Sequence, residues 1–101
     1  MMNNGAEESL MKGNAIRKKL VIQNELGMHV RPASLFARTA GKFNSSIMIR
    51  KGEQHVDGKS IMQLLMLGAL QGTEIVIEAE GDDSDEAVAA LEEIVQNNFG
   101  E

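Results

Sequence analysis

The period at which apolar residues recur changes repeatedly along this chain, and the resulting order of strands and helices constrains its fold more than any other feature. Segments that alternate every two residues or are rich in β-branched residues predict strands, and a spacing of three to four residues predicts amphipathic helices. The expected elements are a strand at 17–23, a helix from 30 to near 41, strands at 46–50 and 53–57 around a Lys51-Gly52 turn, a helix from 61 to about 70, a strand at 73–79 and a helix through 87–95.

Residues at the predicted helix ends support these assignments. Pro32 falls in the first turn of the first helix, where its missing N–H costs nothing. Ser60 is a good N-cap for the second helix, and Gln71-Gly72 is expected to end it. Asp83 and Glu86 have the spacing of a capping box at the start of the last helix.

The order β-α-β-β-α-β-α predicts an α+β fold, an open-faced two-layer sandwich in which helices cover one face of a sheet and the other face meets water. A chain of 101 residues suits one such domain and is too short for two. Residues 1–15 are polar and patternless, so we expect a flexible N-terminal tail there, followed by a folded domain at 16–101.

Composition excludes several kinds of function. The chain has no cysteine, which excludes thiol catalysis and disulfide bonds and fits a cytoplasmic protein. No apolar run is long enough to span a membrane, so we expect no membrane insertion. The net charge of −5 predicts no general nucleic-acid binding. All lysines and arginines lie at or before Lys59, which leaves room for a local basic face toward an acidic protein partner.

The segment GMHVRPAS at 27–34 gathers the residues best suited to chemistry. His29 stands where a loop becomes a helix, so unpaired N–H groups and the positive end of the helix dipole lie beside it. Arg31 adds a planar cation. Together they predict an anion site around an imidazole, and a phosphoryl group carried covalently on that imidazole matches the arrangement. The residues alone equally allow His29 to be a helix cap and Arg31 a solvated residue.

Outside this segment the candidates are fewer. A phosphate on Ser60 would be tolerated by the helix dipole and would change the surface offered to partners. His55 is expected to be an exposed strand residue, and without a ligand cluster around it we expect no metal and no cofactor. The apolar arc of helix 61–70 is wider than one buried stripe requires. It predicts an exposed, methionine-rich docking patch, although a more deeply buried helix is the alternative.

The motifs LGMHVRPAS, GKSIMQLLMLGALQGTEIVIEAEG and DEAVAALEEIV resemble the HPr family, the histidine-containing phosphocarriers of the bacterial phosphotransferase system, over residues 17–99. The resemblance implies a four-stranded antiparallel sheet with three helices on one face. It also implies that Nδ1 of His29 takes a phosphoryl group from phospho-enzyme I, charged by phosphoenolpyruvate, and passes it to an enzyme IIA protein, with Arg31 beside it. Such a protein is a phosphoryl-transfer carrier rather than a stand-alone catalyst.

The same resemblance implies regulation and docking. Ser60 matches the serine that an HPr kinase/phosphorylase modifies, and partners dock on the family at positions that correspond to Ile61, Met62 and Leu65. Val30 replaces the small residue usual between the histidine and the arginine, and its β-branched side chain is expected at the docking rim. We expect a monomer. Features of both the sugar branch and the nitrogen branch occur, so both branches stay open.

Three functions therefore compete at the level of sequence. The first is a phosphocarrier that works through His29 and Arg31. The second is a regulatory module that is phosphorylated at Ser60 and controls a transcription factor or an enzyme. The third is an unrelated small α/β interaction domain in which His29 only caps a helix.

Overall fold

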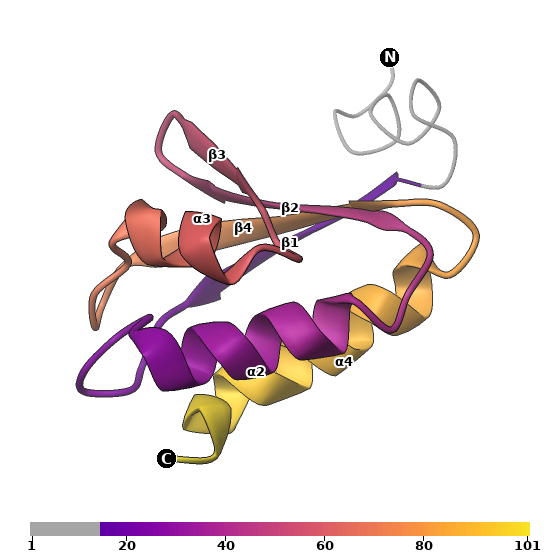
Figure 1. Cartoon of the computed structure of the whole chain (residues 1–101). Helices are drawn as coiled ribbons and strands as arrows, with labels where there is room; N and C mark the ends of the chain where they lie inside the picture. Colours follow the sequence, from indigo (N-terminus) through magenta and orange to yellow (C-terminus); the bar gives the residue numbers. More distant parts are fainter. Residues whose placement is uncertain (1–14) are drawn as a thin grey trace.

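The computed structural model describes residues 15–101, and within them the elements follow the predicted order (Figure 1). Of the expected tail, residues 1–14 lie outside the described part, and Ala15 is the first residue of a strand. The elements are β1 (Ala15–Val21), α2 (Val30–Ala40), β2 (Ser46–Lys51), β3 (Gln54–Asp57), α3 (Ile61–Leu67), β4 (Glu74–Glu80), α4 (Ser84–Gln96) and the short 3-10 helix η1 (Asn98–Gly100).

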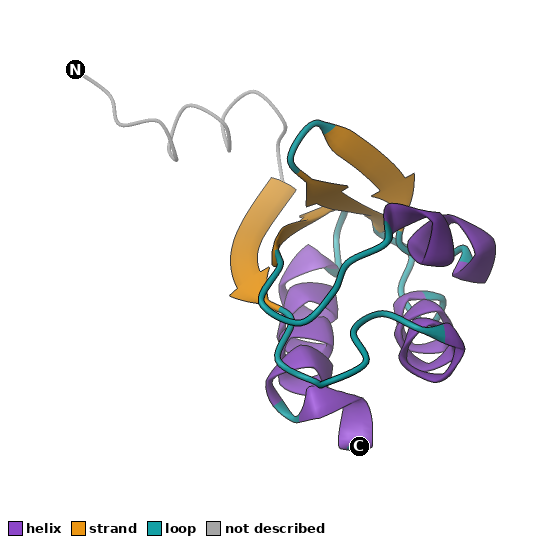
Figure 2. Cartoon of the chain, turned by 90° about the vertical axis from the view of Figure 1, so that its left-hand side faces the viewer, coloured by secondary structure: helices purple, strands orange, loops and turns teal. Residues whose placement is uncertain are grey.

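The four strands form one antiparallel sheet in the order β1-β4-β2-β3. The register places Ala79 of β4 between Ile16 of β1 and Ile47 of β2. Helices α2 and α4 lie side by side against one face of the sheet, and α3 lies beside α2 and β3 (Figures 1 and 2). The predicted open-faced sandwich with three helices on one face is confirmed.

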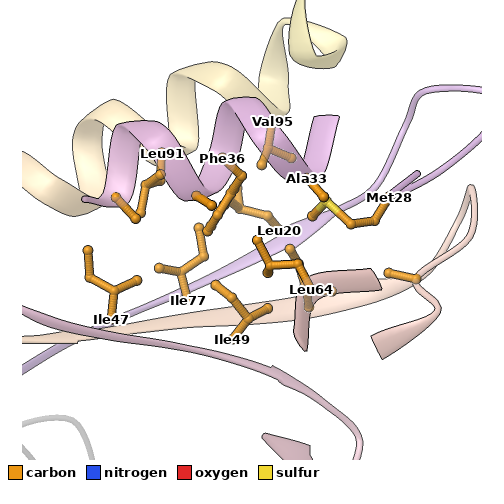
Figure 3. Packing of buried hydrophobic residues seen from close by; sticks show 14 of the residues in the cluster. Leu20, Met28, Ala33, Phe36, Ile47, Ile49, Leu64, Ile77, Leu91 and Val95 are labelled. Carbon is orange, nitrogen blue, oxygen red and sulfur yellow. The ribbon is translucent and has the colours of Figure 1, made fainter. Parts of the chain in front are cut away.

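The core lies between the sheet and the helices, as Figure 3 shows. In β4, Ile75 and Ile77 are fully buried because alternate residues of a strand point to the same face. Phe36 of α2 and Leu91 of α4 are also fully buried and point toward the sheet. Burying an apolar side chain of this size stabilises a fold by about 1.5–3 kcal/mol, so this layer fixes how α2 is placed on the sheet.

The open face of the sheet is polar and ion-paired. Glu78 of β4 lies between two cations, with its Oε2 3.2 Å from Arg17 Nε and 3.8 Å from Arg50 Nη1. Arg50 also donates a hydrogen bond to His55 Nε2 at 3.0 Å. Half-exposed pairs of this kind contribute little stability, but they keep this face hydrophilic and so account for an uncovered sheet.

Helix α3 is shorter than predicted, because it ends at Leu67 and not near Leu70. Gly68 follows in the left-handed conformation, with φ 66°, and its N–H binds the carbonyl of Leu65. The ammonium group of Lys51 donates to the free carbonyl of Leu67 at 2.9 Å. A glycine cap together with a cation on the last carbonyls is a common way to end a helix, and here it acts one turn before Gln71-Gly72.

The predicted capping box at the start of α4 is wrong. Asp83 occupies the N-cap position, but its carboxylate makes no cap hydrogen bond. It accepts instead from the backbone N–H groups of Asn44 and Ser45, at 2.8 and 2.9 Å, and from the hydroxyl of Ser45. Asp83 therefore joins the start of α4 to the segment that enters β2.

Candidate functional site

His29 occupies the N-cap position of α2, with extended backbone angles and no side-chain cap hydrogen bond. Its carbonyl accepts the first helical bond, from Ala33 N–H at 2.9 Å, whereas its imidazole is about one third exposed. The ring is therefore not used to cap the helix. It stands at the positive end of α2, beside N–H groups without helical partners.

The loop before His29 is fixed by Asn24 and Gly27. Asn24 is buried, and its Nδ2 donates to the carbonyl of Gly27 at 2.7 Å. The same carbonyl accepts from the backbone N–H of His29 at 3.0 Å. Gly27 has φ +69°, and a Cβ there would lie 2.5 Å from the carbonyl oxygen of Ala69. The backbone that carries the imidazole is thus held against the loop after α3.

A carboxylate that the sequence analysis missed lies against the imidazole. Glu101 Oε2 is 2.7 Å from His29 Nε2, and Glu101 Oε1 accepts from Asn24 Nδ2 at 3.0 Å. The pKa of Glu101 is lowered, chiefly by the hydrogen bond from Asn24 and further by His29 and by the charge of Arg31, although partial burial opposes these effects. Glu101 is therefore ionised at neutral pH and can only accept hydrogen bonds.

A left-handed turn after α4 brings Glu101 to this place. Asn98 and Phe99 both have φ 56°, and Gly100 has φ 76°. Such angles are strained for a phenylalanine, but Phe99 is only 5% exposed and belongs to the core cluster. Its burial offsets the strain and anchors the turn. The only hint of this turn in the sequence was an apolar residue, Phe99, that follows the polar end of the last helix.

Arg31 lies in the first turn of α2 and is exposed. It lines an open cleft of about 700 Å³, whose other walls include Asn24, Gln71, Asn98 and Glu101. Within residues 15–101 its guanidinium makes no ion pair, so its N–H donors are available to an anion. Glu101, which contacts the imidazole of His29, lines the same cleft. The structure thus brings the predicted His29 and Arg31 to one site.

An apolar surface lies next to this site. Val30, Met62 and Met66 are 61%, 70% and 73% exposed, and Ile61 is 40% exposed. Leu65 differs, because it is half-buried and packs against the core. Since α2 and α3 are in contact, the predicted exposed methionine patch lies next to α2, on which Val30 directly follows His29.

Ser60 is the N-cap of α3, as predicted. Its hydroxyl oxygen accepts from the N–H of Gln63 at 3.2 Å, and the side chain of Gln63 in turn accepts from the N–H of Asp57 at 2.9 Å. Ser60 is half-buried and adjoins the exposed Ile61 and Met62. A charge added to Ser60 would lie directly beside the apolar surface.

His55 is exposed in β3, as predicted, and its Nε2 accepts a hydrogen bond from Arg50. Among residues 15–101 no group of three or more His, Asp and Glu side chains could hold a metal ion. Over the same residues, every helix is too short or too polar to cross a membrane.

The fold and the exposed imidazole at the start of α2 define a class: small α+β open-faced sandwiches that present one histidine at a helix N-terminus. The family model described as "PTS HPr component phosphorylation site" matches residues 16–97. The chain therefore belongs to the HPr family, the phosphocarriers of the phosphotransferase system.

This chain covers almost the whole length of several HPr relatives. The phosphocarrier protein HPr of Neisseria meningitidis is 41% identical over 86 residues, which are 85% of this chain and 97% of the relative. The phosphocarrier protein HPr of Pseudomonas aeruginosa is 42% identical over 84 residues, or 82% of this chain and 93% of the relative. The crystal structure of HPr from Thermoanaerobacter tengcongensis is similar with a TM-score of 0.83 and 43% identity, and covers 85% of this chain and 97% of that one.

Proposed function

We propose that this protein accepts a phosphoryl group on His29 and passes it to a second protein. The observation that carries the proposal is the imidazole at the N-terminus of α2, which does not cap the helix and is partly exposed. Arg31 lies in the first turn of α2 and lines an open cleft together with Glu101, which contacts the imidazole. A guanidinium and free backbone N–H groups stabilise the negative oxygens of a phosphoryl group as it arrives and leaves.

The partners follow from membership of the family. We propose phospho-enzyme I, charged by phosphoenolpyruvate, as the donor and an enzyme IIA protein as the acceptor, with Val30, Ile61 and Met62 as the docking surface for both. One surface suffices, because a carrier must present the same imidazole to each partner in turn. We further propose that the carrier works as a cytoplasmic monomer.

Labelling from phosphoenolpyruvate tests this function. With enzyme I present, the wild-type protein is expected to take up a phosphate that is labile in acid and stable in alkali, as a phosphate bound to nitrogen is. His29→Ala should take up none, and His55→Ala, which changes the other histidine, should label as the wild type does. Absence of label on the wild-type protein would exclude the proposed function.

A second, regulatory function is favoured by the position of Ser60. Its hydroxyl lies at the start of α3, beside the exposed Ile61 and Met62. A phosphate there would put about two negative charges next to the docking surface. We propose that an HPr kinase/phosphorylase modifies it. ATP with such a kinase should produce an acid-stable phosphate that Ser60→Ala abolishes, while labelling of His29 from phosphoenolpyruvate continues in that variant.

A further inference from the structure

The side chain of Glu101 contacts both the ring of His29 and the side chain of Asn24, which holds the loop before His29. One of its oxygens lies 2.7 Å from His29 Nε2, and the other accepts a hydrogen bond from Asn24. Asn24 also binds the carbonyl of Gly27, which accepts from the backbone N–H of His29. Asn24 therefore connects both to the backbone of His29 and, through Glu101, to its ring.

The amide of Asn24 can face only one way in this arrangement. Its two partners, the carbonyl of Gly27 and the carboxylate of Glu101, are both acceptors, so both must meet Nδ2. Its Oδ1 is buried and has no hydrogen-bond partner among the described residues. An unpaired buried carbonyl group costs stability, so its presence in a fold calls for an explanation. Here the explanation is that the amide nitrogen of Asn24 has to bind Glu101 and the loop at the same time.

We propose that Glu101, held by Asn24, is a positioning residue that keeps a proton on Nε2 of His29 and so presents the lone pair of Nδ1 to the phosphoryl group. A carboxylate accepts only, so the nitrogen that it binds must be the N–H of the neutral ring. The remaining nitrogen is then the nucleophile. This inference rests on the proposed function of His29 and explains which ring nitrogen reacts.

The charge of Glu101 also acts during the transfer. The lone pair of Nδ1 forms a bond to phosphorus while the bond between phosphorus and the donor breaks, and the electron pair of that bond leaves with the donor. Nε2 keeps its proton, so the imidazole gains positive charge as the new bond forms. A carboxylate 2.7 Å from Nε2 stabilises this charge, and Arg31, in the first turn of α2, supplies positive charge for the negative oxygens.

Two variants of Glu101 both remove the charge and differ in the hydrogen bonds that remain. Glu101→Ala removes both bonds, whereas Glu101→Gln offers a single acceptor oxygen to two donors, Nδ2 of Asn24 and Nε2–H of His29. Glu93→Gln is the matched control, because Glu93 is an exposed glutamate of α4 and is not among the residues that line the cleft. Asn24→Ala leaves Glu101 in place without the amide that holds it.

The first measurement is the ¹⁵N NMR spectrum of the His29 ring, which reports the tautomer without any phosphoryl transfer. We expect the Nε2–H form in the wild type and in Glu93→Gln, and a mixture of tautomers in Glu101→Gln, Glu101→Ala and Asn24→Ala. If Asn24→Ala does not fold, Glu101→Ala still decides, because Glu101 lies at the surface. A wild-type tautomer in Glu101→Ala would overturn the positioning role.

The second measurement is the rate of phosphorylation by phosphoramidate, a small donor that needs no protein docking. We expect Glu101→Ala to react about 3- to 10-fold more slowly than the wild type, as the loss of one partly exposed hydrogen bond predicts, and Glu93→Gln to react at the wild-type rate. An unchanged rate in Glu101→Ala overturns the catalytic effect. If enzyme I fails to label the wild type, only the proposed function fails, because the tautomer is read independently.

Discussion

Asp83, at the start of α4, accepts hydrogen bonds from both the backbone N–H and the hydroxyl of Ser45, just before β2. The two residues are 38 positions apart, and Gly81 allows their approach, because a Cβ there would lie 2.6 Å from the hydroxyl oxygen of Ser45. The contact ties the loop that follows β4 to the strand next to β4 in the sheet. The carboxylate of Asp83 therefore joins two segments of the fold, whereas a local cap would have bonded only to N–H groups of α4.

The contact between Asp83 and Ser45 predicts a dependence of stability on pH. Hydrogen bonds from Ser45 and Asn44 lower the pKa of Asp83 below its ordinary value of 3.8. A carboxylate with a lowered pKa in the folded state stabilises the fold above its unfolded pKa, and this contribution disappears as the pH falls through the folded value. Asp83→Asn should therefore unfold at a lower urea concentration than the wild type at pH 7, and the difference should shrink below pH 3.8.

A suitable control for that experiment is Asp85→Asn, which removes an exposed acid from the first turn of the same helix. Its urea midpoint should change less at pH 7 than that of Asp83→Asn. Equal shifts for the two variants would mean that α4 responds to charge near its N-terminus and not to the contact with Ser45.

The loop that carries His29 depends on a glycine for two separate reasons. Gly27 has a positive φ, and a Cβ there would lie 2.5 Å from a backbone oxygen. Gly52, in the turn between β2 and β3, has a similar φ of +59° but no atom within 4 Å of such a Cβ. Gly52→Ala should cost about 1–2 kcal/mol of unfolding free energy, the cost of the left-handed conformation. Gly27→Ala should cost more, about 3 kcal/mol, because backbone must also move.

Denaturant unfolding measures both costs, and NMR chemical shifts locate the changes. We expect Gly27→Ala to shift the resonances of His29 and of Ala69, which lie on the two sides of the close contact, and Gly52→Ala to leave them unchanged. Equal losses of stability in the two variants would show that the contact with Ala69 adds nothing to the conformational strain.

The parts of the structure that follow from local pattern could be predicted, and those that depend on distant partners could not. Alternation in β4 and the helical spacing after Val30 determined which faces are buried, because these periods are properties of strands and helices themselves. The end of α3 was misplaced because the apolar spacing continues past Gly68, whose left-handed conformation stops the helix. Asp83 does not form the predicted local cap, because its carboxylate binds Ser45 in another segment of the chain.

The site was predicted in the same uneven way. His29 and Arg31 lie two residues apart at one helix start, so the sequence already brought them together. Glu101 is 72 positions from His29 and reaches it through a left-handed turn that Phe99 anchors. No spacing rule connects residues so far apart, because their contact depends on how α4 packs against the sheet.

Arg31 is expected to act on the phosphoryl group and not on the fold. It is exposed and makes no ion pair within residues 15–101, so Arg31→Ala should leave the unfolding free energy within about 0.5 kcal/mol of the wild type. It should slow phosphorylation of His29 about 10-fold, since a charge-assisted contact to the moving oxygens is lost. Arg31→Lys should recover only part of the rate, because an ammonium lacks the planar donor fork. Lys42→Ala, which removes an exposed cation just after the end of α2, is the control.

The exposed apolar surface predicts a difference between protein donors and small donors. Met62 is 70% exposed on α3, so its side chain is free to be buried by a partner. Met62→Ala should lower kcat/KM for phosphorylation by enzyme I about 10-fold, a typical loss for one apolar anchor. The rate with phosphoramidate should not change, because no docking is needed. Val21→Ala, an exposed residue on β1 away from this surface, should change neither rate. A loss with both donors would place Met62 in the chemistry of His29, and a loss with neither would remove this part of α3 from the docking surface.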